Sequence, residues 1–288
     1  MTVSEPDKPR FPDSFKHAFT YGQSGTGFFG PDVLRGLTEG MDEFLSESSG
    51  RWNRSRSLGP ALLGCVPWFD DPELLARVVC FPSACVVVTK QELKKRGRAA
   101  FEELKRHAAQ GRGFPAEAFS TLTGMASRYD GEPPLLYPTS PRPPSVRLQT
   151  FRSFGFRKSG GTPVPILHAK LFLLGELWWH DEHPEGYVDD IVGFTPKRLW
   201  LGSANGTRSS RLSLEFGLWV DDRELLAHAK EFLVQVLEHS EGIDPDDDQF
   251  DPEFVPYDYD DEAFWEYYRD LGSHVDPDDE ADDGPDDE

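Results

Sequence analysis

Five polar side chains between Ile166 and Val220 have the types and spacing that phosphate chemistry requires. They interrupt apolar runs of strand length and are His168, Lys170, Ser203, Asn205 and Glu215. Side chains alternate faces along a strand, so His168 and Lys170 are expected to share a face. Ser203 and Asn205 share one too if their strand continues past Gly202. Glu215 lies within an apolar run, where a buried carboxylate needs a partner that a histidine can supply.

Phosphodiester hydrolysis needs a nucleophile, a proton donor for the leaving oxygen, and donors or cations for the non-bridging oxygens. His168 can be the nucleophile through a phosphohistidine, and Lys170 supplies a fixed cation. Asn205, with Ser203, can donate hydrogen bonds to the phosphate. Glu215 is expected to orient His168 and to fix its tautomer.

The order His-x-Lys, Gly-Ser-x-Asn and then a Glu in the next apolar run resembles the signature of the phospholipase D superfamily. The resemblance covers Arg51–Ser240, and its diagnostic part is Ile166–Val220. It implies a mixed α/β sheet flanked by helices, and phosphodiesterase chemistry that needs no metal and no other cofactor. The family's mechanism uses two histidines, whereas this chain has one His-x-Lys. The simplest solution is a homodimer that brings His168 of each copy to a twofold axis.

Two features depart from the family's short form. That form has an Asp five residues after the Lys, where this chain has Gly175. Gly175–Pro196 is also inserted before the Gly-Ser pair, so the two halves are expected to meet through a longer hairpin. These departures leave open a degenerate pocket that binds without cutting, because fold does not guarantee activity.

The preceding chain is expected to form the start of the same domain. Strand and helix patterns alternate in the order Ala61–Val66, a helix that starts at Asp70–Glu73, Cys85–Thr89 and Gln91–Gln110. This order predicts a parallel crossover. A strand over Val146–Phe151 and an amphipathic helix over Arg223–His239 complete the prediction.

Basic side chains just before the His-x-Lys strand are the candidate substrate contacts. They are Arg147, Arg152, Arg157 and Lys158, and cations at such positions suit a nucleic-acid backbone. His180 and His183 form a His-x-x-His pair, but the sequence supplies no third ligand, so no metal site is predicted.

Charge divides the chain into parts. Residues 243–288 hold 21 acidic side chains and one basic one, so this tail carries almost all of the formal net charge of -21. The prediction is an N-terminal extension over 1–50, a catalytic domain over 51–242, and an acidic aromatic tail over 243–288 whose last part is disordered. The aromatic part of the tail either docks on its own domain or binds a protein partner or the cleft.

The remaining features place the protein in the cytoplasm. No run of roughly 18 apolar residues is present, so no membrane span is expected. The first residues lack the apolar core of a signal peptide. Three cysteines in 288 residues favour reduced thiols.

Three functions follow from these observations. The preferred one is a metal-independent nuclease acting on DNA or RNA, a possible component of a bacterial defence system. The first alternative is a phospholipase or phosphatidyl transferase. The second is a non-catalytic subunit that recruits protein partners through its acidic tail.

Overall fold

The computed structural model describes residues 17–21, 25–49, 56–90, 95–110, 113–127, 135–136, 146–155, 167–181, 190–244 and 252–273. The main sheet contains β1 (His17–Tyr21), β2 (Gly25–Gly30), β3 (Ser57–Cys65), β4 (Ser83–Thr89), β9 (Phe151–Phe154), β10 (Leu171–Asp181), β11 (Asp190–Gly202), β12 (Glu215–Val220) and β13 (Glu241–Gly242). The helices are α1 (Val33–Ser49), α2 (Pro72–Val78), α3 (Lys95–Gln110), α4 (Arg223–Glu238) and α5 (Asp261–Ser273). The shorter elements are β5 (Phe114–Pro115), β6 (Met125–Ser127), β7 (Leu135–Leu136), β8 (Arg147–Leu148), β14 (Phe254–Pro256), β15 (Asp258–Tyr259) and the 3-10 helices Ala116–Ala118 and Ser210–Leu212.

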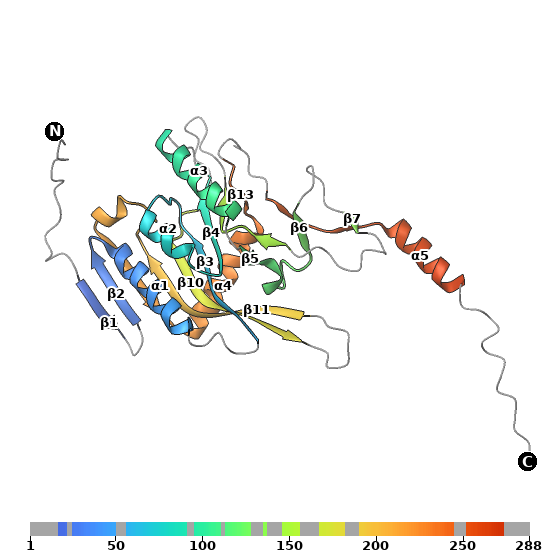
Figure 1. Cartoon of the computed structure of the whole chain (residues 1–288), viewed down its shortest axis with the longest axis horizontal. Coiled ribbons are helices and arrows are strands. Elements are labelled where there is room, and N and C mark those ends of the chain that lie inside the picture. The colour runs from blue at the N-terminus through green and yellow to red at the C-terminus, as the bar shows by residue number, and fades with distance from the viewer. Residues whose placement is uncertain are drawn as a thin grey trace, which may run out of the picture.

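Within these residues the main sheet has nine strands in the order β1-β2-β12-β11-β10-β3-β4-β9-β13 (Figure 1). Strands β3, β4 and β9 run parallel to one another, and the other neighbours are antiparallel. Helices α1, α2 and α3 pack on one face, and α4 packs on the other. The predicted mixed α/β sheet flanked by helices is therefore confirmed.

The predicted crossover is formed by β3, α2 and β4. Successive side chains of β3 enter opposite cores: Leu62 packs with α1 and α2, and Leu63 packs with α4. Asp71 caps α2 by accepting a hydrogen bond of 2.8 Å from the amide of Leu74, directly before Pro72. A carboxylate at the cap and a proline at the first position both favour a helix start here.

The N-terminal segment belongs to the main sheet, which corrects the predicted boundary at residue 50. Strand β2 pairs with β12 from Gly30 opposite Glu215 to Thr26 opposite Trp219. Helix α1 adds Leu34, Leu37 and other apolar side chains to the core shared with α2 and α3. The segment therefore holds β12 in place instead of extending from a finished domain.

The longer hairpin is confirmed as the pair β10 and β11, whose register shifts between Leu174 and Gly175. The hairpin also explains why a glycine occupies position 175, where the sequence resemblance leads one to expect Asp. A Cβ at residue 175 would overlap the carbonyl oxygen of Thr195 and lie 2.5 Å from the ring of Phe194. Position 175 therefore has no room for an aspartate side chain.

The tail divides into a docked part and a projecting helix. Strand β14 pairs with β6, and Phe254 and Tyr257 are buried. Helix α5 extends away from the sheet, at the right of Figure 1, and its Trp265 is 70% exposed. Docking in cis therefore holds for the start of the tail and not for α5, while residues 274–288 lie outside the described part. None of the described helices has the length and apolar character needed to cross a membrane.

Candidate active site

His168 and Lys170 lie on the extended segment that leads into β10. Leu167 and Ala169 pack in the core beneath α4, so the alternating His168 and Lys170 project from the opposite side. The Nζ of Lys170 lies 3.3 Å from Nδ1 and 3.4 Å from Nε2 of His168. It also donates a hydrogen bond of 2.9 Å to the carbonyl oxygen of His168. The prediction that these two side chains share a face is confirmed.

Burial lowers the pKa of Lys170 from its ordinary value, and the nearby carboxylate of Glu215 acts in the opposite direction by favouring the cation. His168 is exposed, so a substrate can reach its imidazole from solvent. The site thus combines an accessible ring with a partly buried ammonium at hydrogen-bond distance.

Ser203 directly follows β11 and forms hydrogen bonds to the first residues of β12. Its hydroxyl donates a hydrogen bond of 2.5 Å to Oε2 of Glu215 and accepts one of 2.9 Å from the amide of Phe216. The amide of Ser203 donates to the carbonyl oxygen of Phe216. The hydrogen-bond partner that the structure gives Glu215 is therefore Ser203. The orientation of His168 by Glu215 stays a prediction.

Asn205 is placed by a loop, because β11 ends at Gly202. The condition under which strand alternation would put Ser203 and Asn205 on one face is therefore not met. The next residue, Gly206, anchors this loop: its carbonyl oxygen accepts hydrogen bonds of 2.9 and 3.0 Å from the amides of Asp70 and Asp71. The loop therefore reaches the site from the end of the sheet where α2 begins.

Arg211 holds the same loop from its far end, and the sequence analysis missed it. Its guanidinium donates to both carboxylate oxygens of Asp71, at 2.5 and 2.8 Å, and to Asp32 at 3.0 Å. These carboxylates raise the pKa of Arg211. Burial opposes ionisation of Asp71, but hydrogen bonds from Arg211 and from the amide of Leu74 hold its pKa below the usual value. The signal in the sequence was a pair of arginines, Arg208 and Arg211, shortly after the Gly-Ser-x-Asn motif.

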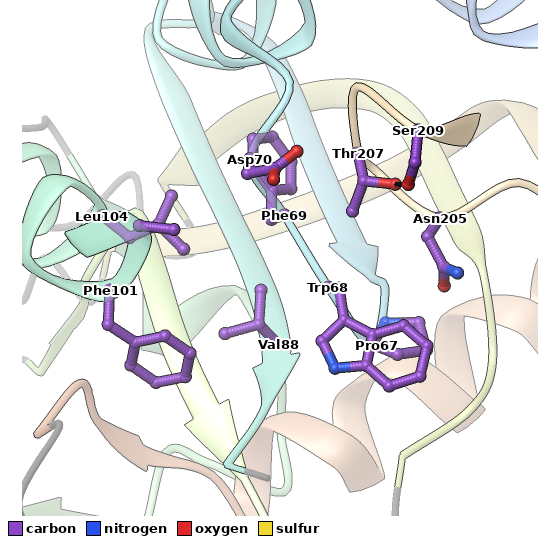
Figure 2. A pocket seen from close by; sticks show the side chains of 11 residues that line it. Pro67, Trp68, Phe69, Asp70, Val88, Phe101, Leu104, Asn205, Thr207 and Ser209 are labelled. Atoms are coloured by element: carbon purple, nitrogen blue, oxygen red, sulfur yellow. Dashed lines mark hydrogen bonds between the residues drawn. The ribbon is translucent and has the colours of Figure 1, made fainter. Parts of the chain in front are cut away.

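A pocket of 370 Å³ opens beside these residues, between α3 and the loop that carries Asn205 (Figure 2). Val88, Phe101 and Leu104 form its apolar side. Asn205 and Thr207 lie across from them, with Trp68 between the two sides in Figure 2. The ring of Trp68 meets the ring of His168 edge-on, with centroids 6.3 Å apart. The pocket and the His-Lys pair are therefore neighbours.

The predicted substrate contacts divide into three cases. Arg152 is a correction: it is 1% exposed, donates to Ser240, and forms an ion pair of 2.8 Å with Glu253. It stabilises the docked tail and cannot reach a substrate in this structure. Arg147 is exposed on β8. Arg157 and Lys158 lie outside the described residues.

Metal ligands do not gather in the described part of the chain, where no three His, Cys, Asp or Glu side chains come together to hold an ion. His183 of the His-x-x-His pair lies outside the described residues.

No protein-family model and no curated protein matches the chain. Several solved structures are similar to it. NucT from Helicobacter pylori is similar with a TM-score of 0.41 and 13% identity, over 76% of this chain and 98% of that one. A phospholipase D family member, Nuc from Salmonella typhimurium, has a TM-score of 0.39 and 13% identity, over 75% and 97%. Phosphatidylserine synthase from Haemophilus influenzae has a TM-score of 0.37 and 15% identity, over 77% of this chain and 41% of that one.

Proposed function

We propose that this chain is a phosphodiesterase of the phospholipase D type that cleaves nucleic acid through a phosphohistidine on His168. The observation that carries the proposal is the contact between Lys170 and His168, with Nζ 3.3 Å from Nδ1. A cation at that distance can hold a phosphate oxygen while the ring attacks phosphorus. Glu215, which accepts a hydrogen bond from Ser203, favours the charged form of this cation and so raises the pKa of Lys170 against the effect of burial.

The reaction proceeds in two displacements. A ring nitrogen of His168 attacks phosphorus, the bond to the leaving oxygen breaks, and that oxygen takes a proton from His168 of a second copy. Water then attacks the phosphohistidine and gives a proton back to the second imidazole as the phosphorus–nitrogen bond breaks. Asn205 and Lys170 stabilise the negative oxygens in both steps. No step is assigned to a metal or other cofactor.

The second copy is proposed to bind next to β12, the strand that starts at Glu215. Apolar side chains are exposed there: Leu212 by 51%, Leu214 by 48% and Phe216 by 41%. Phe29 on the neighbouring β2 lies 6.3 Å from Phe216, centroid to centroid. A contiguous apolar patch of this kind marks an interface, and its position would bring two sites together.

Nucleic acid is the preferred substrate because the sequence resembles a family whose members with a single His-x-Lys motif are mostly nucleases. A role in bacterial defence is a hypothesis that rests on the sequence resemblance alone.

The test compares plasmid, RNA and phospholipid vesicles as substrates in the presence of EDTA. We expect cleavage of nucleic acid by the parent chain and at least a thousandfold loss in His168→Ala. His228→Ala is the matched control, because His228 is exposed on α4, away from the site, and should retain full activity. Vesicle hydrolysis that depends on His168 would select the phospholipase alternative. Silence with every substrate would select the non-catalytic one.

The dimer has its own test by light scattering. The Phe216→Ser variant should be monomeric and should also be inactive. Leu225→Ser removes an apolar side chain of similar exposure from α4 and should leave a dimer. A parent chain that is monomeric at the assay concentration and fully active would exclude the shared site.

A further inference from the structure

The pocket next to His168 has a lining that the hydrolysis of a phosphodiester does not itself require. Trp68 is common to both places: it lines the pocket and meets the imidazole edge-on at an interplanar angle of 83°. Asn205 is common as well, since it lines the pocket and belongs to the phosphate motif. A group that enters the pocket is therefore part of the substrate and is attached close to the phosphate that His168 attacks.

The lining excludes a second phosphate as the occupant. None of the described residues that line the pocket is Lys, Arg or His, and Asp70 adds a carboxylate. One side is apolar, from Val88, Phe101 and Leu104. Phosphate groups are bound most strongly by cations, which this lining lacks, and the hydroxyls of Thr207 and Ser209 already hydrogen-bond to each other at 2.9 Å. The occupant is expected to be flat or apolar on one side and uncharged.

The polar side of the pocket is rich in acceptors. The Oδ1 of Asn205 is buried and has no hydrogen-bond partner among the described residues. Asp70 is exposed, and one of its carboxylate oxygens accepts a hydrogen bond of 2.8 Å from the amide of Arg208. A buried acceptor without a donor is unfavourable, so an occupant that brings an N–H group to Asn205 is preferred. Choline has no N–H group and leaves this need unmet.

The size also fits a heterocycle and not a small headgroup alone. At 370 Å³ the pocket lies in the range of ligand sites, roughly 300–1,000 Å³. Trp68 is 36% exposed and offers an aromatic edge and face at the entrance. Unstacked bases of single strands stack on such side chains and hydrogen-bond through their edges.

We propose, on the basis of the proposed function, that this pocket receives an unstacked nucleobase with an exocyclic amino group next to the scissile phosphate. Adenine, cytosine and guanine offer amino donors to Asn205 and Asp70. Thymine and uracil present carbonyl oxygens on both sides of one N–H group, so they fit less well. The protein should therefore act on single-stranded nucleic acid and discriminate between bases.

The test uses variants that fill the pocket without removing core side chains. Ala100→Trp adds a large side chain to the pocket from α3. Ala99→Trp is its matched control, because Ala99 is the preceding residue, is exposed and does not line the pocket. Ser209→Trp fills the pocket from the opposite, exposed side if Ala100→Trp does not fold. Each change is made in the His168→Ala background, so that binding is measured without cleavage. The probes are single strands of adenine, cytosine or thymine nucleotides and an abasic strand of equal length.

We expect the His168→Ala protein to bind the adenine and cytosine strands at least tenfold more tightly than the abasic strand. The affinity for the thymine strand should lie between these two values. Ala100→Trp or Ser209→Trp should abolish this preference, and Ala99→Trp should retain it. Equal binding of base-bearing and abasic strands would overturn the inference, as would a preference that survives both pocket-filling variants.

Failure of the proposed function gives a different pattern. If strands bind with the expected preference but the parent chain cleaves none of them, the nuclease assignment fails and the pocket assignment stands. If the parent chain hydrolyses phosphatidylethanolamine vesicles, and Ala100→Trp prevents this while base-dependent binding is absent, the pocket holds a lipid headgroup and the inference is wrong.

Discussion

The guanidinium of Arg211 donates hydrogen bonds to both carboxylate oxygens of Asp71. This contact holds the loop that carries Asn205 against the start of α2. Asp71 is buried and also caps that helix, so one carboxylate serves two contacts. The contact connects the loop of Asn205 with the loop of Trp68. The alignment of the phosphate site with the neighbouring pocket therefore depends on an ion pair that takes no part in the chemistry.

Arg211→Met should destabilise the fold by about 2 kcal/mol at neutral pH, because it leaves Asp71 buried without its cation. The pKa of Asp71 is lowered in the folded state, so its contribution is present above the unfolded pKa and is lost as the pH falls through the folded value. The variant should therefore lose less stability than the parent on acidification. Urea unfolding at neutral and acidic pH measures both effects.

Arg35→Met is the control for this change. Arg35 pairs with Glu39 on the surface of α1, so the substitution should leave the free energy of unfolding almost unchanged. If the two substitutions lowered the free energy of unfolding by the same amount, the Arg211–Asp71 contact would stabilise the fold no more than a surface ion pair does.

Lys170 predicts a second loss of activity at alkaline pH, beyond the loss expected when the imidazole that protonates the leaving oxygen is deprotonated. Burial lowers the pKa of Lys170, so the free enzyme should lose this cation, and with it the remaining kcat/KM, at a pH below the ordinary lysine range. Arginine remains charged throughout, so Lys170→Arg should flatten this limb even if its maximal rate is lower. The pH profile of kcat/KM on a base-free phosphodiester measures the limb. An alkaline limb that is identical in both proteins would assign it to another group.

The packing around Gly175 predicts the result of placing an aspartate at this position. Gly175→Asp should destabilise the hairpin by about 3 kcal/mol and should not raise activity, because the new side chain overlaps Phe194 and Thr195. Gly124→Asp is the matched control, since a Cβ there has no atom within 4 Å. Thermal unfolding and turnover are measured for both. A stable, more active Gly175→Asp protein would contradict the packing described here.

Two truncations of the tail are expected to differ in their effects on stability and activity. Removal of residues 261–288 takes away α5 and much of the acidic charge, and it leaves the Arg152–Glu253 pair and the buried Phe254 intact. We expect unchanged stability and, if the acidic tail restrains the site, faster cleavage. Truncation after Gly242 removes Glu253 and should lower the free energy of unfolding by about 3 kcal/mol. Equal stability of the two truncated chains would show that the docked segment adds nothing.

The sequence predicted those parts of the fold whose signals are local. The cap and proline at Asp71–Pro72 located α2, and the apolar runs located β3, β4 and the hairpin. Alternation placed His168 and Lys170 on one face. Each of these signals needs only neighbouring residues, which is why it could be recognised before the structure.

The errors came from contacts between distant residues. Arg152 was assigned to substrate, yet its partners Ser240 and Glu253 lie 88 and 101 residues away. Arg211 finds Asp71 at a separation of 140 residues. Strand β2 consists largely of glycine and phenylalanine and has its partner in β12, far along the chain, so residues 1–50 were assigned to an extension and not to the sheet.

The central claim is a covalent bond between phosphorus and His168, and trapping it is the most direct test. The parent protein is mixed with a single-stranded phosphodiester substrate, quenched in alkali, which preserves phosphohistidine, and analysed by peptide mass spectrometry. We expect a nucleotide adduct on the peptide that contains His168, absent from His168→Ala and present in His228→Ala. Turnover without an adduct at His168, together with full activity of His168→Ala, would contradict it.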